Sequence, residues 1–307
     1  MKLLSQRLNK PEYWFRPRQI LRKFQYAFRR DTPENSAHIR LPWKATIQVN
    51  PRETIGQSLL TLGVYELAVS ETLWRLTEPG DWCLDVGANI GYMTSLLATK
   101  AQFAGKVFSF EPHPLVFARL QANTNDLADG KRAPVEASQM AIGVTDGKMN
   151  LVEPEGFTHN EGVARLTNEL QANSSSHNVV ITRLDSMFCR GEIFGVVKVD
   201  VEGFELSVFQ GAVQLLSQNR IRDIVFEDFE VFPSACAKLL QNHGYTIFRI
   251  AKKVFGPVIW DPLEPKAADF ALDYEPINYL ATVNPQRALK LLQPRGWFCL
   301  KAKIPAA

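Results

Sequence analysis

Short apolar runs alternate with amphipathic stretches along most of the chain. Leucines at helical spacing predict a helix over 57–77 that ends before Pro79-Gly80. Further apolar periods predict strands at Trp82–Val86, Lys106–Phe110, Val135–Ile142, Val196–Val201, Ile224–Phe226 and Tyr245–Ile250, with helices at Gly91–Thr99, Pro114–Asn123, Phe204–Ser217 and Ser234–His243. Strands that alternate with helices predict a mostly parallel sheet covered on both faces. Right-handed crossovers make this a doubly wound α/β fold.

This pattern also predicts how the chain is divided. Residues 147–185 interrupt the alternation with Gly, Asn and Ser, which indicates a hairpin or loop insertion. We expect an N-terminal segment over 1–56, the sheet domain over 57–250, and an extension over 251–307 that packs on the domain. Trp260 and Pro262 favour an ordered, loop-rich cover for that extension.

Composition is that of an ordinary globular protein, with 46% hydrophobic and 22% charged residues in 307. The four cysteines form no CxxC pair, which argues against a disulfide framework or a zinc site and fits a reducing compartment. No apolar run approaches the roughly 20 residues of a membrane-spanning helix, and no signal-peptide core follows the first residues. These features predict a cytoplasmic protein.

Positive charge is concentrated in the N-terminal part of the chain. Residues 1–44 contain eleven Lys or Arg and three Asp or Glu, interleaved with aromatic residues. Such a segment is typical of contact with an anionic membrane surface or with nucleic acid. The alternative is a helix that packs its aromatic residues on the domain, and Pro11, Pro17 and Pro33 favour it because they interrupt a long amphipathic helix. No strong nucleic-acid signal is present, and a peripheral membrane contact is the partner that we retain for this segment.

The strongest chemical signal is the loop Asp85-Val86-Gly87-Ala88-Asn89-Ile90-Gly91 directly after the first strand of the alternating pattern. Gly87 and Gly91 permit a sharp turn, and the following helix offers unpaired N–H groups to an anionic group. The third glycine of a dinucleotide-binding loop is absent, and Asp85 would repel a pyrophosphate. A ligand with an amino-acid end fits better, and S-adenosylmethionine (SAM) has such an end. The alternative is a glycine turn that only allows close strand–helix packing.

A second acid, Glu111, ends the next strand, 24 residues after Gly87. An acid at this place can accept hydrogen bonds from both hydroxyls of an adenosine ribose. We therefore predict SAM binding by Asp85, Gly87, Asn89, Gly91 and Glu111, with Glu111 at the ribose.

The chain resembles the FkbM-type SAM-dependent methyltransferases over roughly residues 57–250. The resemblance rests on Asp85–Gly91 followed by Tyr92, on Phe110-Glu111-Pro112, and above all on Lys198-Val199-Asp200-Val201-Glu202-Gly203. Weaker matches are Gly63-Val64-Tyr65-Glu66, Ala141-Ile142-Gly143, Asn160-Glu161-Gly162, Leu184-Asp185-Ser186 and Phe226-Glu227. The resemblance implies a class I (Rossmann-like) methyltransferase fold and transfer of a methyl group from SAM, usually to a hydroxyl of a sugar or secondary metabolite. The specific acceptor does not carry over, and neither does a role for His113, which replaces a smaller polar residue of the family.

The block from Lys198 to Glu202 is also informative by itself. Residues two apart on a strand share a face, so Lys198, Asp200 and Glu202 are expected to project together toward the crevice at the strand ends. A carboxylate there can take the proton of an acceptor hydroxyl. We predict Asp200 as the general base, with Glu202 next and Lys198 as an orienting partner. The alternative is a structural Lys198–Glu202 pair with Asp200 capping the following helix.

Other polar residues give weaker signals. Glu227 can line the same crevice, and Glu66 is a candidate cofactor contact or a surface ion-pair partner. The five histidines show no metal-ligand spacing, and we predict no metal site. Two other function classes stay open: a nucleotide-dependent oxidoreductase, which the loop disfavours, and a non-catalytic protein that binds RNA or membranes through residues 1–44.

Overall fold

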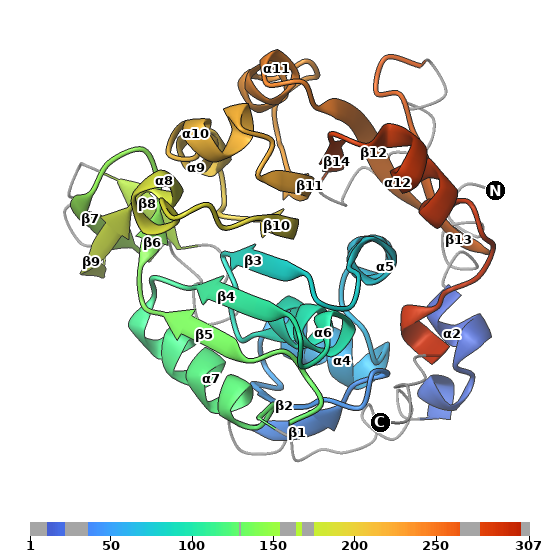
Figure 1. The fold of residues 1–307 in the computed structure, drawn as a ribbon. Helices are drawn as coiled ribbons and strands as arrows, with labels where there is room; N and C mark the ends of the chain where they lie inside the picture. The colour runs from blue at the N-terminus through green and yellow to red at the C-terminus, as the bar shows by residue number, and fades with distance from the viewer. Residues whose placement is uncertain are drawn as a thin grey trace.

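A computed structural model describes residues 11–21, 36–128, 130–153, 164–167, 175–264 and 277–301. Its centre is a sheet of eight strands within these residues (Figure 1). The strand order is β13 (Gly256–Trp260), β12 (Thr246–Lys253), β14 (Asn278–Thr282), β11 (Ile221–Glu227), β10 (Phe194–Val199), β3 (Trp82–Val86), β4 (Lys106–Phe110) and β5 (Val135–Ser138). The pairings from β11 to β5 are parallel, and those of β14, β12 and β13 are antiparallel. The predicted α/β sheet is confirmed.

Helices cover both faces of this sheet, because alternate residues of a buried strand point to opposite sides. Cys83 and Val107 face one hydrophobic core, while Leu84 and Phe108 face the other. The first core contains α4 (Thr54–Thr61), α5 (Leu67–Leu76), α6 (Tyr92–Ala101), α7 (Pro114–Asn125) and α12 (Pro285–Leu292), and the second contains α8 (Leu184–Met187), α9 (Glu205–Gln210), α10 (Val213–Ser217) and α11 (Ala235–Asn242). The chain builds outward from β3 to β5 and then returns to β10 on the other side of β3. This reversal creates the switch point at which doubly wound sheets bind ligands.

The insertion forms a second, smaller sheet. Its order is β6 (Ala141–Ile142), β9 (Ser176–Thr182), β7 (Gly147–Val152) and β8 (Arg165–Thr167), with β7 antiparallel to both neighbours. The predicted strand Val135–Ile142 is wrong as a single element, because β5 belongs to the central sheet and β6 to this one. Residues 154–163 and 168–174 lie outside the described part of the chain, so the Asn160-Glu161-Gly162 motif and His159 do too.

The helix predicted over 57–77 is two helices, α4 and α5. The chain turns between them at Gly63, with φ of +78°, and at Glu66, with φ of +41°. A Cβ on Gly63 would lie 2.6 Å from the Gln19 side chain, so packing against the N-terminal segment requires glycine there. The turn carries Tyr65 and Glu66 to the pocket described below.

The helix predicted over 204–217 is likewise interrupted, between α9 and α10. A Cβ on Gly211 would lie 1.9 Å from the carbonyl oxygen of Gly143. The carbonyl oxygen of Gly211 also accepts a hydrogen bond from the Asp185 backbone, and the Asp185 carboxylate accepts the N–H groups of Gln214 and Leu215. Contacts with other parts of the chain therefore end α9 and begin α10.

The N-terminal part is only partly described. The hairpin of β1 (Ala37–Arg40) and β2 (Thr46–Val49) joins the first core, and the buried Trp43 indole donates a hydrogen bond to Ser95. Helix α2 (Pro11–Phe15) packs Phe15 against the C-terminal segment, whereas Trp14 is exposed. Much of the basic segment, residues 1–10 and 22–35, lies outside the described residues, so its membrane contact stays a prediction.

The expected divisions near residues 57 and 250 do not follow boundaries in the structure. The hairpin before residue 57 shares its core with the sheet domain. After residue 250 the chain does not merely cover the domain, since β14 lies between β11 and β12 and so completes the central sheet. Within the described residues, none of the helices has the length and apolar character that crossing a membrane requires.

Candidate active site

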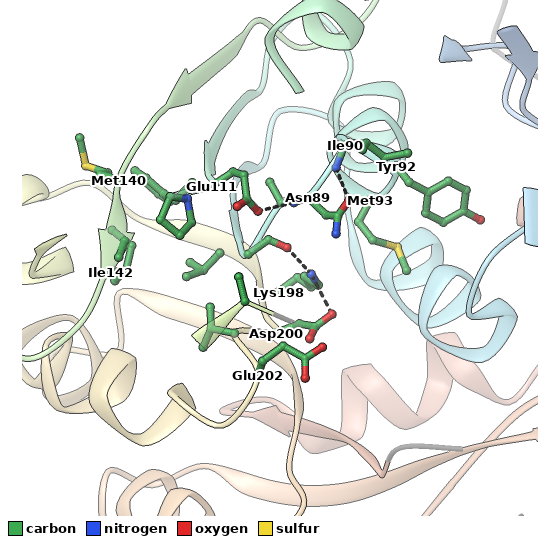
Figure 2. A pocket seen from close by; sticks show the side chains of 18 of the residues that line it. Asn89, Ile90, Tyr92, Met93, Glu111, Met140, Ile142, Lys198, Asp200 and Glu202 are labelled. Carbon is green, nitrogen blue, oxygen red and sulfur yellow. Dashed lines mark hydrogen bonds and ion pairs between the residues drawn. The ribbon is translucent and has the colours of Figure 1, made fainter. Parts of the chain in front are cut away.

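A pocket opens at the carboxyl ends of β3, β4 and β10, at the switch point of the sheet (Figure 2). The space between its walls, with the open mouth included, is about 1040 Å³. Its lining is mixed. Polar side chains of Asn89, Glu111, Lys198, Asp200 and Glu202 face apolar ones that include Pro112, Met140, Ile142 and Leu151. The predicted location of the site at the strand ends agrees with this pocket.

The loop after β3 lines the pocket, but its N–H groups are engaged within the protein. Gly87 and Ala88 donate to the carbonyl oxygen of Phe110, at 3.0 and 2.9 Å. The Asn89 N–H donates to Glu111, and the Asn89 side-chain oxygen accepts a hydrogen bond from the N–H of Ile90. These bonds hold the loop against the end of β4. The predicted anion contact concerned the N–H groups at the start of the following helix, α6, which these bonds do not use, so it stays a prediction.

Packing explains why this loop requires glycines. A Cβ on Gly87 would lie 1.8 Å from the Asp200 carbonyl oxygen, and one on Gly91 would lie 2.9 Å from the Leu120 side chain. Both glycines also have positive φ, at +77° and +88°. The alternative of a turn for close packing therefore holds at both positions. A substitution such as Gly87→Val would first displace the end of β10.

Glu111 lies at the end of β4 with its carboxylate in the pocket. One oxygen accepts the Asn89 N–H at 3.0 Å and the other accepts the His113 N–H at 2.9 Å. Burial raises the pKa of Glu111 to about 7, although these two N–H groups and the charge of Lys198 oppose the rise. Each carboxylate oxygen has a second lone pair. The group can therefore accept two further hydrogen bonds from adjacent ligand hydroxyls.

Asp85 occupies a different place from the one predicted. It is fully buried beneath the loop and is not among the residues that line the pocket. Its carboxylate accepts a hydrogen bond from Thr94 at 2.6 Å and lies 3.7 Å from the Lys198 ammonium. Burial raises the pKa of Asp85, while Lys198 and Thr94 lower it. This position favours a role in holding Lys198 over direct contact with a ligand.

Lys198 is the cation at the centre of the site. Its ammonium donates to the Gly87 carbonyl oxygen at 2.8 Å and contacts Asp200 at 3.2 Å (Figure 2). Burial alone would lower the pKa of Lys198, but the carboxylates of Asp200 and Asp85 raise it above its usual value. The lysine thus joins the ends of β3 and β10. The ion pairs of Lys198 are with Asp200 and Asp85, whereas the alternative interpretation pairs it with Glu202.

Asp200 and Glu202 both reach the pocket, as predicted, although β10 ends at Val199 and neither is a strand residue. Glu202 has a φ of +53°, an uncommon backbone conformation for this residue type. The side chain that accepts N–H groups before α9 is Glu205, which bonds Val201 and Gly203. Asp200, whose side chain is 29% exposed, stays accessible from the pocket.

Two acids add to this end of the pocket. Glu66 lines it at the start of α5, and Glu227 ends β11 close to Asp200. Burial, together with the negative charges of Asp200, Glu66 and Glu202, raises the pKa of Glu227 to about 10. Glu227 therefore holds a proton at neutral pH. The strand-end position of Glu227 was the sequence signal for it.

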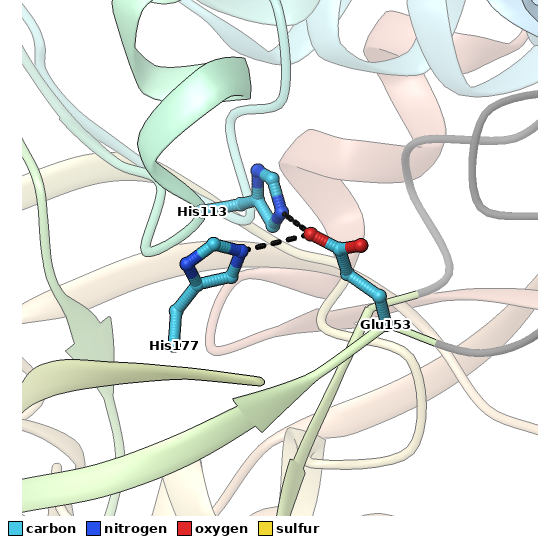
Figure 3. Close-up of side chains that lie close together, drawn as sticks. All are labelled: His113, Glu153 and His177. Atoms are coloured by element: carbon cyan, nitrogen blue, oxygen red, sulfur yellow. Dashed lines mark hydrogen bonds and ion pairs between the residues drawn. The ribbon is translucent and has the colours of Figure 1, made fainter. Parts of the chain in front are cut away.

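The structure also brings together residues that the sequence analysis treated as separate. His113 and His177, 64 residues apart, lie side by side, and both contact the same carboxylate oxygen of Glu153 (Figure 3). The five histidines show no metal-ligand spacing in the sequence, yet the fold brings these two together. The contact depends on how the smaller sheet docks beside α7, which no local sequence pattern encodes.

Residues 85–247 match the family described as the methyltransferase FkbM domain. The hexuronic acid methyltransferase AglP of Haloferax volcanii is 32% identical over 154 residues, 49% of this chain and 58% of AglP. The 31-O-demethyl-FK506 methyltransferase FkbM of Streptomyces tacrolimicus is 29% identical over 200 residues, 55% of this chain and 74% of that protein. The chain thus aligns with less than two thirds of the length of AglP.

A SAM-dependent methyltransferase from Agrobacterium tumefaciens is among the similar solved structures. It has a TM-score of 0.46 and 9% sequence identity, and the match covers 83% of this chain and 72% of that chain.

Proposed function

The chain belongs to the FkbM family of SAM-dependent methyltransferases, and from this premise we propose that it methylates a hydroxyl oxygen of a sugar or another hydroxylated small molecule. The observation that carries the proposal is the Glu111 carboxylate, buried at the end of β4 and directed into the pocket at the switch point. The name of one relative, a 31-O-demethyl-FK506 methyltransferase, supports an oxygen acceptor, and that of the other, a hexuronic acid methyltransferase, supports a sugar acid as a substrate class.

The cofactor half of the pocket fits SAM. Each carboxylate oxygen of Glu111 keeps one lone pair that can accept a hydrogen bond from a ribose hydroxyl. Pro112, Met140 and Ile142 supply the apolar walls that a planar base requires. SAM, when bound, supplies an electrophilic methyl group on a sulfonium. The start of α6, directly after the loop from Gly87 to Gly91, would position its amino-acid end, with Lys198 as the nearby cation.

The acceptor half is formed by Asp200 and its neighbours. The Lys198 ammonium contacts the Asp200 carboxylate. The pKa of the neighbouring Glu227 is raised, so of these two acids Glu227 is the one that carries a proton. Asp200 can therefore accept a proton from an acceptor hydroxyl while the oxygen attacks the methyl group. Glu202 and Glu66 line the same end and are suited to accept hydrogen bonds from further hydroxyls of a sugar.

Cofactor binding tests the first half of the proposal. Calorimetric titration of the full chain with SAM should show one saturable site, and titration with NADH should show none. Glu111→Gln should weaken SAM binding by about tenfold or more, since hydrogen bonds to a charged group are lost. Glu136→Gln, an exposed acid on β5, is the matched control. Equal SAM affinity in the two variants would contradict the ribose assignment.

Turnover tests the second half. Asp200→Asn should bind SAM nearly as the natural chain does, while methyl transfer to a responsive acceptor falls by roughly 100-fold or more, as for a lost general base. The acceptor panel should include hexuronic acids, neutral sugars and hydroxylated macrocycles, with methyl incorporation read by mass spectrometry. Unchanged turnover in Asp200→Asn would exclude it as the base. Failure of every hydroxyl acceptor with SAM bound would overturn O-methylation.

A further inference from the structure

We propose that His113, Glu153 and His177 form a binding site for one divalent transition-metal ion, with Zn²⁺ as the best match (Figure 3). The Nε2 atoms of both histidines point at the same carboxylate oxygen, Oε1 of Glu153, at 2.9 and 2.8 Å. The site involves none of the residues assigned above to methyl transfer. It therefore stands or fails independently of the proposed function.

The donor set and its spacing suit zinc. Two imidazoles and one carboxylate are a known ligand combination for Zn²⁺, with the fourth position open to water. Bonds of about 2.0–2.2 Å in tetrahedral geometry put neighbouring donor atoms about 3.3 Å apart. The three donor atoms here all lie within 4.8 Å of one another. To admit the ion, the two shorter contacts widen by about half an ångström, and the two histidine nitrogens, up to 4.8 Å apart, approach each other to about the same donor spacing.

Each ligand comes from a separate segment that the backbone holds in place. His113 immediately precedes α7, and its N–H donates to Glu111. Glu153 follows β7, and its N–H donates to the Ser175 carbonyl oxygen at 2.9 Å. His177 lies on β9, opposite Leu151 of β7. Ligands positioned by hydrogen-bonded elements lose little freedom on binding, which favours affinity.

The environment also favours a cation over hydrogen bonding alone. The His113 side chain is only 1% exposed, and Glu153 is 19% exposed. An ionised carboxylate beside two neutral imidazoles carries a net negative charge, and a divalent ion compensates that charge when the three groups coordinate it. His177 is 31% exposed, which leaves a path of entry from solvent.

The consequence of metal binding would be mechanical. The ion would join the insertion sheet, through Glu153 and His177, to the start of α7, two residues from Glu111. Leu151 of β7 and Glu111 both line the pocket. A metal at this place would fix the wall beside the proposed ribose site. Its role is then structural, so its loss should be read first in metal content and thermal stability.

The test is metal binding to the full chain after treatment with a chelator and desalting. Calorimetric titration with Zn²⁺ should give one equivalent per chain, and Co²⁺ should give the visible absorption of a bound nitrogen–oxygen site. His177→Ala should weaken binding by 100-fold or more, and Glu153→Gln, which keeps the side-chain size, should weaken it by at least tenfold. The matched control is His243→Ala, a histidine at the end of α11. All proteins should carry Cys189→Ser, because that exposed thiol is an alternative zinc ligand.

Two results would overturn the site. One is the absence of stoichiometric Zn²⁺ or Co²⁺ binding by the folded chain. The other is binding that survives in both His177→Ala and Glu153→Gln, which would mean that other groups hold the metal. In the expected case Zn²⁺ raises the melting temperature of the natural chain and of His243→Ala, and leaves that of His177→Ala unchanged. Circular dichroism of the metal-free variants checks that each retains the fold.

Discussion

Glu227 combines a buried carboxyl group with an acidic environment. Three acids lie near it: Asp200 after the end of β10, Glu66 at the start of α5, and Glu202 in the segment before α9. The Tyr65 phenol also lies close to this group of acids. Burial and the negative charges of these acids together raise the pKa of Glu227 to about 10. In the unfolded chain a glutamate titrates near pH 4.3. The native state therefore binds one more proton than the unfolded state across the interval between these values.

The sign of the pH effect follows from this difference. Where the native state binds more protons, stability falls as pH rises, so Glu227 should lower stability progressively from about pH 4.3 to about pH 10. Glu227→Gln keeps the shape and hydrogen-bonding capacity of the protonated acid without the titration. We expect a shallower fall of the melting temperature between pH 5 and pH 9 in this variant.

Thermal melts at half-unit pH intervals measure this slope. Exposed Glu264→Gln is the control, and its profile should follow that of the natural chain. Identical slopes for Glu227→Gln and the natural chain would show that Glu227 is ionised in the folded state. That result would also remove the reason to place the shared proton on Glu227 and not on Asp200.

Gly211 decides the shape of one element, the helical segment after the Lys198–Glu202 block. Its Cα approaches the Gly143 carbonyl oxygen so closely that a Cβ would lie 1.9 Å from that atom. Gly211→Ala must push α9 away from the start of the insertion, and overpacking of this kind costs about 1–3 kcal/mol. Exposed Gln210→Ala, one residue earlier, should change the unfolding free energy by less than about 0.5 kcal/mol. Urea unfolding measures both, and equal values would contradict the packing argument.

Such positions mark the limit of what the sequence could predict about the elements. The strands Trp82–Val86 and Lys106–Phe110 match the structure at both ends, because each is an apolar run bounded by turn residues. The helices expected over 57–77 and 204–217 have correct local periodicity, but tertiary contacts at Gly63 and Gly211 divide them. Local patterns carry no information about an approach from a distant carbonyl or side chain.

In the candidate site, too, some features could be predicted from the sequence and others could not. Glu111 and Asp200 were predictable, since each follows a strand whose carboxyl end had to lie at the crevice. The partner of Lys198 was not, because Asp85, Asp200 and Glu202 were all within plausible reach and only packing chooses among them. The contact of His113 with His177 through Glu153 depends on how the smaller sheet docks and was equally hidden.

At the scale of the whole molecule, one buried ion pair ties the C-terminal segment to the fold. The Arg75 guanidinium on α5 bonds Glu71 at 2.6 Å and donates to carbonyl oxygens of Leu292, Pro294 and Gly296. The Glu71 carboxylate in turn accepts the N–H groups of Phe298 and Cys299, both at 2.8 Å. Residues from α12 to the 3-10 helix η4 (Cys299–Lys301) therefore depend on two side chains of α5.

Removal of one partner of a buried pair costs more than the pair contributes, because the other charge is left uncompensated. Arg75→Ala should thus lower the unfolding free energy by about 3–5 kcal/mol, and Glu71→Gln should act in the same direction. Arg183→Ala breaks an exposed pair with Asp146 and should cost less than about 1 kcal/mol. Denaturant unfolding followed by the fluorescence of the six tryptophans measures both changes, and one of the six, Trp297, is buried in the core that Cys299 and Leu300 share. If Arg75→Ala matched Arg183→Ala, the buried pair would not stabilise the C-terminal segment, and the pairing of β14 with β11, together with the Arg287–Asp223 ion pair, would account for its attachment.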